Sequence, residues 1–303
     1  MPWRNGAKGI LEAYLGGQAV GGAVINILYG NVNPSGKLAE TMPVKLSDNP
    51  AHLNFGDGDK VHYNEGIFVG YRYYDAKEME VAFPFGHGLS YTTFTYSNLR
   101  ADKNTLADTD TLTVSVDITN TGDRAGKETV QFYVNDQTGY CRRPEKELKG
   151  FEKVSLQPGE TKTVSVTLDA RSFAWYNTEL HDWFIGSGTF EILVGASSRD
   201  IRESIAVQMN SAQQLPLHVH MNTTFGELLN HPRTREYGLD LQKKMTAFFG
   251  SPEGEERSES SSEAISDEMN DAMAASMPLR NAVTFGLCTK EELTEMIDSM
   301  NQM

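Results

Sequence analysis

The stretch Leu112-Thr113-Val114-Ser115-Val116-Asp117-Ile118 decides the fold of the central part of the chain. Its apolar side chains fall on every second residue, which is the period of a β-strand with one buried side. The same alternation returns in Val164-Ser165-Val166-Thr167-Leu168, and again at Phe190, Ile192 and Val194. Three such runs predict antiparallel strands that share one hydrophobic core.

Turn-forming residues separate these runs. They occur in Asn120-Thr121-Gly122-Asp123, in Gln157-Pro158-Gly159-Glu160 and in Gly186-Ser187-Gly188. Six or seven short strands at this spacing predict a β-sandwich of the immunoglobulin or fibronectin III kind over residues 96–208. A segment of this length can bury a core of its own.

Residues 1–95 are rich in glycine and contain one clear helix signal. The helix is predicted because five apolar residues follow the spacing of one helix face: Val20, Ala23, Val24, Ile27 and Leu28. Gly30 can close this helix in a left-handed conformation, and the glycines that precede it make packing against a sheet necessary. No series of strands accompanies it within 1–95. The segment is therefore predicted to be the remnant of an α/β domain, with its packing face partly exposed.

Residues 209–303 change to helical patterns. Thr224 with Glu227, and Thr289 with Glu292, form capping boxes that predict two helix starts. The last helix has an apolar face, which includes Leu293, Met296, Ile297 and Met300, with Met277, Leu279 and Phe285 available to dock against it. Residues 251–271 are acidic and lack aromatic side chains, which predicts a flexible linker. The predicted fold class is thus mixed: a partial α/β segment, an all-β sandwich and a small α-helical tail.

The composition excludes several classes of function. The 303 residues carry a net charge of −14, which disfavours nucleic-acid binding because phosphates require clustered Lys and Arg. No apolar run approaches the roughly 18 residues of a membrane helix. The glycine-rich stretches lack the Lys-Ser/Thr pair of a phosphate loop, and the histidines lack metal-ligand spacing. We therefore predict no metal and no cofactor.

Cys141 and Cys288 fit no metal or redox spacing and are predicted to be unpaired thiols. Scarce cysteines favour a cytoplasmic location. No signal peptide is visible after Met1, although the chain opens on a sequence typical of a domain interior, so any leader would precede it. No oligomeric state is predicted.

The densest functional pattern runs from Tyr63 to Asp75. Tyr63, Glu65, Tyr71, Arg72 and Tyr74 combine aromatic rings with charged groups, which suits a sugar-binding surface where rings stack on pyranose faces. The alternative is a buried helix or strand edge in which Arg72 forms a salt bridge to Asp75 or Glu65. Glu65 alone does not make a catalytic site, because glycoside hydrolysis needs two opposed carboxylates roughly 5–10 Å apart.

A second aromatic group consists of Trp175, Tyr176 and Trp183. It could form a platform for a polysaccharide. In a sandwich, such rings more often fill the core or the strand ends. Both interpretations stay open from the sequence.

The run Gly30-Asn31-Val32-Asn33-Pro34-Ser35-Gly36-Lys37-Leu38 resembles the end of the α/β-sandwich domain of glycoside hydrolase family 3. The segment Glu65-Gly66-Ile67-Phe68-Val69-Gly70-Tyr71 is similar to the same family's passage into its fibronectin-III-like domain. The motifs Arg143-Pro144-Glu145-Lys146-Glu147-Leu148-Lys149-Gly150-Phe151 and Gly195-Ala196-Ser197-Ser198-Arg199-Asp200 resemble its fibronectin-III-like domain. The resemblance covers residues 1–208.

The resemblance implies a retaining β-glucosidase-type enzyme that needs no cofactor and hydrolyses terminal β-D-glucosyl residues. In the family, the nucleophile is an Asp of an N-terminal TIM barrel and the acid/base is a Glu of the second domain. No residue of this chain matches either motif. We therefore expect the chain alone to be inactive, with an N-terminal half as its partner and β-glucosides as substrates of the intact enzyme. The alternative is a non-catalytic, carbohydrate-binding or domain-stabilising module.

Overall fold

The computed structural model describes residues 1, 3–56, 58–215, 218–231, 233–249 and 267–302. The chain divides into two compact units, Met1–Gln214 and Leu215–Met303, which are described separately. The first unit contains the predicted sandwich together with residues 1–95. Most of the predicted linker, 251–266, lies outside the described residues.

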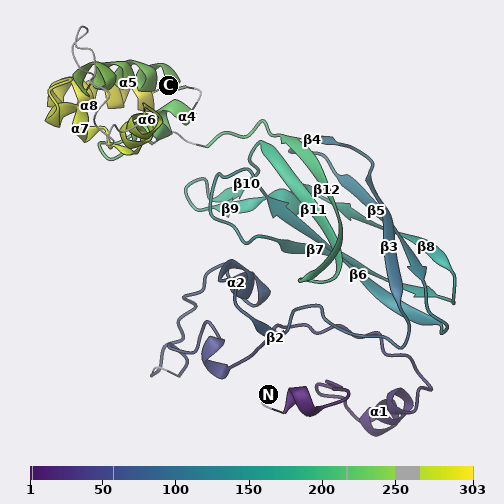
Figure 1. The fold of residues 1–303 in the computed structure, drawn as a ribbon. Helices are drawn as coiled ribbons and strands as arrows, with labels where there is room; N and C mark the ends of the chain where they lie inside the picture. Colours follow the sequence, from purple (N-terminus) through teal and green to yellow (C-terminus); the bar gives the residue numbers. More distant parts are fainter. Residues whose placement is uncertain (2, 57, 216–217, 232, 250–266, 303) are drawn as a thin grey trace, which may run out of the picture. The chain divides into compact units, whose positions relative to one another are not determined.

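The first unit is dominated by two sheets that face each other (Figure 1). The five-stranded sheet has the order β4-β12-β11-β6-β7 and the three-stranded sheet the order β3-β5-β8. All neighbours are antiparallel except β12 and β4. The strands are β3 (Phe94–Ala101), β4 (Thr105–Ala107), β5 (Leu112–Asn120), β6 (Gly126–Asp136), β7 (Glu147–Leu156), β8 (Thr161–Leu168), β11 (Gly188–Ser197) and β12 (Asp200–Asn210).

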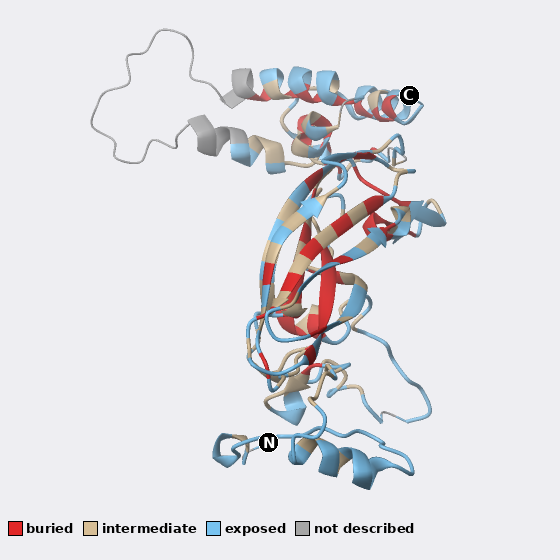
Figure 2. Cartoon of the chain, turned by 90° about the vertical axis from the view of Figure 1, so that its right-hand side faces the viewer, coloured by how far each residue is buried: buried red, intermediate tan, exposed pale blue. Residues whose placement is uncertain are grey.

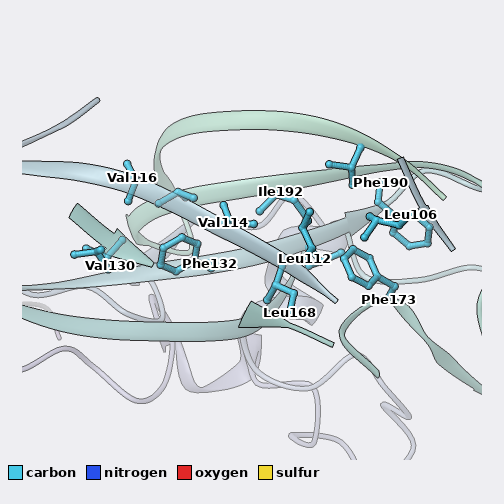
Figure 3. Packing of buried hydrophobic residues seen from close by; sticks show 14 of the residues in the cluster. Leu106, Leu112, Val114, Val116, Val130, Phe132, Leu168, Phe173, Phe190 and Ile192 are labelled. Carbon is cyan, nitrogen blue, oxygen red and sulfur yellow. The ribbon is translucent and has the colours of Figure 1, made fainter. Parts of the chain in front are cut away.

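The hydrophobic core lies between these two sheets (Figure 3). The four alternating residues that opened the sequence analysis, all in β5, are fully buried there: Leu112, Val114, Val116 and Ile118. The other two alternating runs form β8 and β11, and their inward side chains join the same cluster. The predicted all-β sandwich is confirmed, and with it the mixed fold class.

Strand β6 departs from the two-residue period because both of its faces are covered. Val130, Phe132 and Val134 enter the core. On the opposite face, Gln131 and Tyr133 are also buried, since residues of the N-terminal segment pack over them. The strand therefore shows no alternation in the sequence, and period-based reasoning missed it.

Outside the two sheets, the first unit contains short elements. They are the 3₁₀ helices η1 (Arg4–Gly6) and η2 (Leu46–Asp48), the helices α1 (Val20–Leu28), α2 (Tyr71–Ala76) and α3 (Ala170–Phe173), and the strands β1 (Met42–Pro43), β2 (Val81–Phe83), β9 (Trp175–Asn177) and β10 (Asp182–Phe184). Strands β1 and β2 pair with each other, as do β9 and β10.

The predicted helix over residues 20–28 is present as α1, and Gly30 follows it with φ +75°. No residue of α1 is buried, and Figure 2 shows the N-terminal part of the chain mostly in the colour of exposed residues. The expectation of a partly uncovered packing face is confirmed. Helix α2, with only six residues, was not predicted.

The second unit has its own apolar core. Its helices are α4 (Phe225–Asn230), α5 (Arg235–Phe249), α6 (Asp267–Ser276), α7 (Arg280–Thr284) and α8 (Lys290–Asn301). Both predicted capping boxes are present, at Thr224–Glu227 and at Thr289–Glu292. Helix α6 begins at Asp267, so the helix includes residues 267–271, which were predicted as linker. Their composition includes good helix formers such as Glu268 and Met269.

The closing helix α8 buries Leu293, Ile297 and Met300, while Leu279, Met277 and Phe285 pack in the same cluster, as predicted.

Both cysteines are free. Among the described residues, no helix is both long and apolar enough to cross a membrane.

Candidate functional site

The predicted sugar-binding segment divides into two parts at Gly70. Before it, Tyr63 is 81% exposed and Glu65 half-buried, in a loop of successive turns. Gly70 itself has φ +56° and precedes α2, a conformation that favours glycine. After it, Tyr71 and Tyr74 turn inward and are 8% and 3% exposed. The structure therefore separates the five predicted residues into two in the loop, exposed Tyr63 and half-buried Glu65, and three held in α2.

Tyr71 joins α2 to the sandwich. Its hydroxyl accepts a hydrogen bond from the backbone N–H of Leu148 in β7 at 2.8 Å. Its ring stacks on Phe85, with centroids 4.8 Å apart, and meets Tyr133 edge-on at 6.0 Å. Such aromatic contacts stabilise by about 0.5–1.5 kcal/mol beyond the area they bury. The Tyr71 side chain therefore packs against other residues of this chain, and its ring does not form an open surface on which a sugar could stack.

Tyr74 is held in the same helix. Burial raises the pKa of its phenol, and the charge of Asp48 and the neighbouring Tyr73 raise it further. Its ring meets that of Tyr73 edge-on at 5.5 Å. For Tyr71 and Tyr74, this geometry favours the buried-edge alternative that the sequence left open.

The predicted salt bridge of Arg72 to Asp75 or Glu65 is wrong. Arg72 lies 3.8 Å from Glu147 of β7 instead, and it donates a hydrogen bond to the carbonyl of Ile67 at 3.5 Å. Asp75 pairs with two other cations, Lys146 at 3.0 Å and Arg199 at 2.8 Å. The sequence could not suggest these partners because they lie far along the chain, Glu147 in β7, Lys146 directly before it and Arg199 in the turn between β11 and β12.

Glu147 is the centre of a charged cluster. Arg143 lies 2.8 Å and Lys149 2.7 Å from its carboxylate, and Arg143 also pairs with Asp136 at 3.0 Å. Burial raises the pKa of Glu147. The hydrogen bond from Lys149 and the charges of Lys149, Arg143 and Arg72 outweigh burial and hold the pKa below its usual range. Burial lowers the pKa of Lys149, although Glu147 opposes this shift.

A third buried ion pair connects the N-terminal segment to strand β6 of the sandwich. Lys37 lies 3.0 Å from Glu128 of β6 and also donates to the carbonyl of Gly88. Tyr96 of β3 donates to the same carboxylate at 3.0 Å. Burial and Glu128 raise the pKa of the Tyr96 phenol well above its usual range.

We use the word seam for the contact between residues 33–92 and the sandwich. Its members are Lys37, Tyr71, Arg72, Asp75, Phe85 and Gly86 on one side, and Glu128, Gln131, Tyr133, Lys146, Glu147 and Arg199 on the other. Gln131 is central, since its amide donates to the carbonyls of Gly86 and Ala196 at 3.1 and 2.8 Å. The sequence did carry one signal that could have found the seam: the charged residues of 143–149 lie inside the segment predicted to be a sandwich, where a buried charge needs a partner.

The seam does not have the chemistry of a hydrolytic centre. Each buried carboxylate in the described part of the chain, at Asp75, Asp136, Glu128 and Glu147, contacts a cation. A pocket of about 290 Å³ lies near the N-terminus, and none of the described residues that line it is acidic. The described residues also contain no group of three or more His, Cys, Asp and Glu that could hold a metal ion.

The second aromatic group forms the outward hairpin β9–β10. Tyr176 and Trp183 are opposite each other across the two strands and are 47% and 36% exposed. The guanidinium of Arg171 covers the Trp183 ring at 3.2 Å. Trp175 points to the other side and packs on buried Phe184 at 5.6 Å. The hairpin thus has one side that packs on buried Phe184 and one side that is half-exposed.

Comparison with known proteins identifies the class to which this architecture belongs. Residues 1–91 match the family model described as the glycosyl hydrolase family 3 C-terminal domain, and residues 128–198 match the fibronectin type III-like domain. The chain belongs to glycoside hydrolase family 3.

Among curated relatives, the chain is 48% identical to the thermostable beta-glucosidase B of Acetivibrio thermocellus over 309 aligned residues, covering 100% of this chain and 39% of the relative. It is 45% identical to an exo-alpha-(1->6)-L-arabinopyranosidase of Bifidobacterium longum, covering 69% of this chain and 27% of that protein. The chain therefore spans less than half the length of these relatives.

Solved structures of beta-glucosidases also match this chain. The GH3 beta-glucosidase of Bifidobacterium adolescentis matches with a TM-score of 0.69 and 41% identity, covering 80% of this chain and 35% of that one. The beta-glucosidase of Kluyveromyces marxianus in complex with glucose matches with a TM-score of 0.65 and 45% identity, covering 69% and 25%.

Proposed function

We propose that this chain supplies the C-terminal part of a β-glucosidase-type enzyme that hydrolyses terminal β-D-glucosyl residues with retention. The observation that carries the proposal is its 48% identity, along its whole length, to a protein named beta-glucosidase. In such a reaction one carboxylate attacks the sugar and a second donates and later accepts the proton. In this proposal, an N-terminal half with a TIM barrel supplies both carboxylates.

The chain's own residues serve this enzyme by holding its parts together. The seam fixes residues 33–92 on the sandwich through three ion-pair groups: Lys37 with Glu128, Asp75 with Lys146 and Arg199, and Arg72 with Glu147. Buried pairs of this kind favour one geometry over others, even where they add little net stability. The fibronectin-III-like sandwich is thus a base that keeps the preceding segment in a defined position.

Incubating the purified chain with a chromogenic β-D-glucoside tests the assignment of the carboxylates. We expect no turnover, because the buried acids that the structure describes are already neutralised by cations. Purified full-length beta-glucosidase B is the positive control. Sustained turnover by the chain alone would overturn the proposal. An α-L-arabinopyranoside should be tested in parallel, because one relative is named for that substrate.

A second candidate is non-catalytic sugar binding by the loop that carries Tyr63 and Glu65. It is favoured by the 81% exposure of the Tyr63 ring, which leaves a face open for stacking on a pyranose. Titration with cellobiose, followed by NMR, would show saturable shifts that disappear in Tyr63→Ala. The absence of shifts in the parent chain rejects this candidate.

The cytoplasmic location expected from the cysteines remains a prediction.

A further inference from the structure

The charged cluster around Glu147 contains more positive than negative charge. Arg143 and Lys149 lie 2.8 and 2.7 Å from one of its carboxylate oxygens, Oε2, and Arg72 lies 3.8 Å from the other, Oε1. In the described part of the chain, the one further carboxylate paired with these cations is Asp136, 3.0 Å from Arg143. Three cations therefore face two carboxylates, although the chain as a whole has a net charge of −14.

The cluster is largely shielded from water, which makes its surplus charge costly. The exposed fractions of the side chains are 6% for Arg143, 10% for Glu147 and 17% for Lys149. A charge removed from water needs a partner of opposite charge. Burial lowers the pKa of Lys149, and Glu147 opposes this shift. The charges of Arg143 and Arg72 lower the pKa of Lys149 further, as expected where positive charge is in excess.

Arg72 is the cation of this cluster that has donors to spare. Its side chain is 27% exposed, so it reaches the surface of the cluster. Of its five N–H donors, one makes a hydrogen bond within the described residues, a long one of 3.5 Å to the carbonyl of Ile67. Helix α2 places Arg72 beside the start of β7, where Lys149 lies (Figure 1). Exposed Arg142 adds positive charge next to this turn, since its guanidinium lies 5.4 Å from the centre of the Phe68 ring.

We propose that Arg72 and Lys149 together bind a small oxyanion of the phosphate class at the junction of α2 and β7. A guanidinium offers parallel N–H groups that match two oxygens of such an anion, and an ammonium group adds a further donor. The bound anion supplies the negative charge that the cluster lacks. Because Arg72 belongs to residues 33–92 and Lys149 to the sandwich, the anion also strengthens the contact between these two parts of the first unit.

Titration of the purified chain with sodium phosphate at pH 7 tests the proposal. Phosphate replaces sodium chloride at constant ionic strength, while binding is followed by backbone amide shifts in NMR and by the urea midpoint of unfolding. We expect saturable shifts around Arg72 and Lys149 and a higher midpoint, because a ligand that binds only the folded chain stabilises it. Glucose 6-phosphate is titrated in parallel. Tighter binding than inorganic phosphate assigns the site to a sugar phosphate, and equal or weaker binding assigns it to the free ion.

Three variants localise the anion. Arg72→Gln should raise the Kd for phosphate by about tenfold or more, because a hydrogen bond to a charged group is lost. Arg100→Gln is the matched control and should leave the Kd unchanged, since Arg100 also pairs with one carboxylate, Asp117 at 3.2 Å, but is half-exposed on β3. Glu147→Gln should lower the Kd by about threefold or more, because the surplus of positive charge grows. A general loss of structure would change binding in the opposite direction.

The proposal is overturned if the phosphate shifts do not saturate, or if the Kd is the same in the parent chain and in Arg72→Gln. An Arg100→Gln variant that loses as much affinity as Arg72→Gln also overturns it, because the effect would then come from the overall charge of the chain. Weaker binding by a folded Glu147→Gln variant rejects the surplus charge as the cause of binding.

Discussion

Gln131 is buried on the outer face of β6, where its side chain joins three parts of the first unit. Its amide nitrogen donates to Gly86 and Ala196, and its oxygen accepts from the Tyr133 hydroxyl at 2.6 Å. The fit leaves no room at Gly86, where an added Cβ would lie 2.0 Å from the Gln131 oxygen. Gly86 also has φ +77°, which side chains other than glycine rarely adopt.

Gly86→Ala should therefore destabilise the first unit through two effects. The left-handed backbone costs about 1–2 kcal/mol for a residue with a Cβ, and the overlap with Gln131 adds about 1–3 kcal/mol. Urea unfolding followed by tryptophan fluorescence measures the sum. Gly159→Ala is the control, since Gly159 has φ +76° in open space. Equal losses in the two variants would contradict the close fit at Gln131.

Glu147 makes the stability of the first unit depend on pH. Its pKa is lowered in the folded chain, so it stays ionised at a pH where an unfolded Glu, with a pKa of about 4.3, binds a proton. Its contribution is fully present above that unfolded value and is lost as the pH falls through the lower, folded value. Glu147→Gln should flatten the acid side of the stability curve.

The measurement for Glu147 is urea unfolding between pH 7 and pH 3. Glu152→Gln provides the comparison, because Glu152 is exposed on the same strand. A curve for Glu147→Gln that keeps the slope of the parent chain below pH 5 would reject a role for this carboxylate in acid stability.

At the scale of elements, the two-residue period of apolar side chains identified the strands that have one solvent-facing side. β5, β8 and β11 follow the two-residue period because only their inner sides enter the core. β6 does not, because the N-terminal segment covers its other side. Helix α2 was not predicted because six residues carry little pattern, and because it depends on Gly70 and on partners far along the chain, such as Arg199.

For the candidate site, the sequence predicted the segment but not its ion pairs. Composition alone identified the segment from Tyr63 to Asp75. It could not assign Arg72 to Glu147 or Asp75 to Arg199, because ion pairs between distant segments follow no period. The capping boxes, by contrast, are local and were identified from four-residue spacings.

The capping box of α8 gives an element-scale prediction. Thr289 accepts from the N–H of Glu292 at 3.2 Å, and Glu292 accepts from the N–H of Thr289 at 2.7 Å. Thr289→Ala should cost about 1 kcal/mol in the stability of α8. Faster amide hydrogen exchange in α8 would show this. Thr294→Ala in the same helix should have no such effect, because its hydroxyl bonds only the carbonyl of Lys290 and alanine favours helix.

At the scale of the whole molecule, residues 1–92 are fixed unevenly. The seam holds the parts around Lys37, Asp75 and Gly86, while Leu15, Leu53 and Phe55 are 88–102% exposed. Backbone with few buried contacts opens more readily than backbone tied into a sheet. The N-terminal region therefore combines firmly held stretches with weakly held ones.

Brief trypsin digestion should reveal this difference. Within the first unit, early cuts are expected after Lys8 and Lys60, both of which are exposed. Lys37 lies in the same region but pairs with Glu128 and should be spared, which makes it an internal control. Mass spectrometry of the fragments identifies the cuts. Early cleavage after Lys37, or within the strands of the sandwich, would contradict the prediction.

The double coverage of β6 has a consequence for protein engineering. The sandwich cannot be exchanged as a cassette for another module of the same shape, because an ordinary replacement would present a polar, water-facing strand to Tyr71 and Phe85. A working graft would have to carry Gln131 and Tyr133 with it. In this chain, the boundary suitable for recombination therefore lies ahead of residue 33, before the first contact with the sandwich, and not at the start of the first strand.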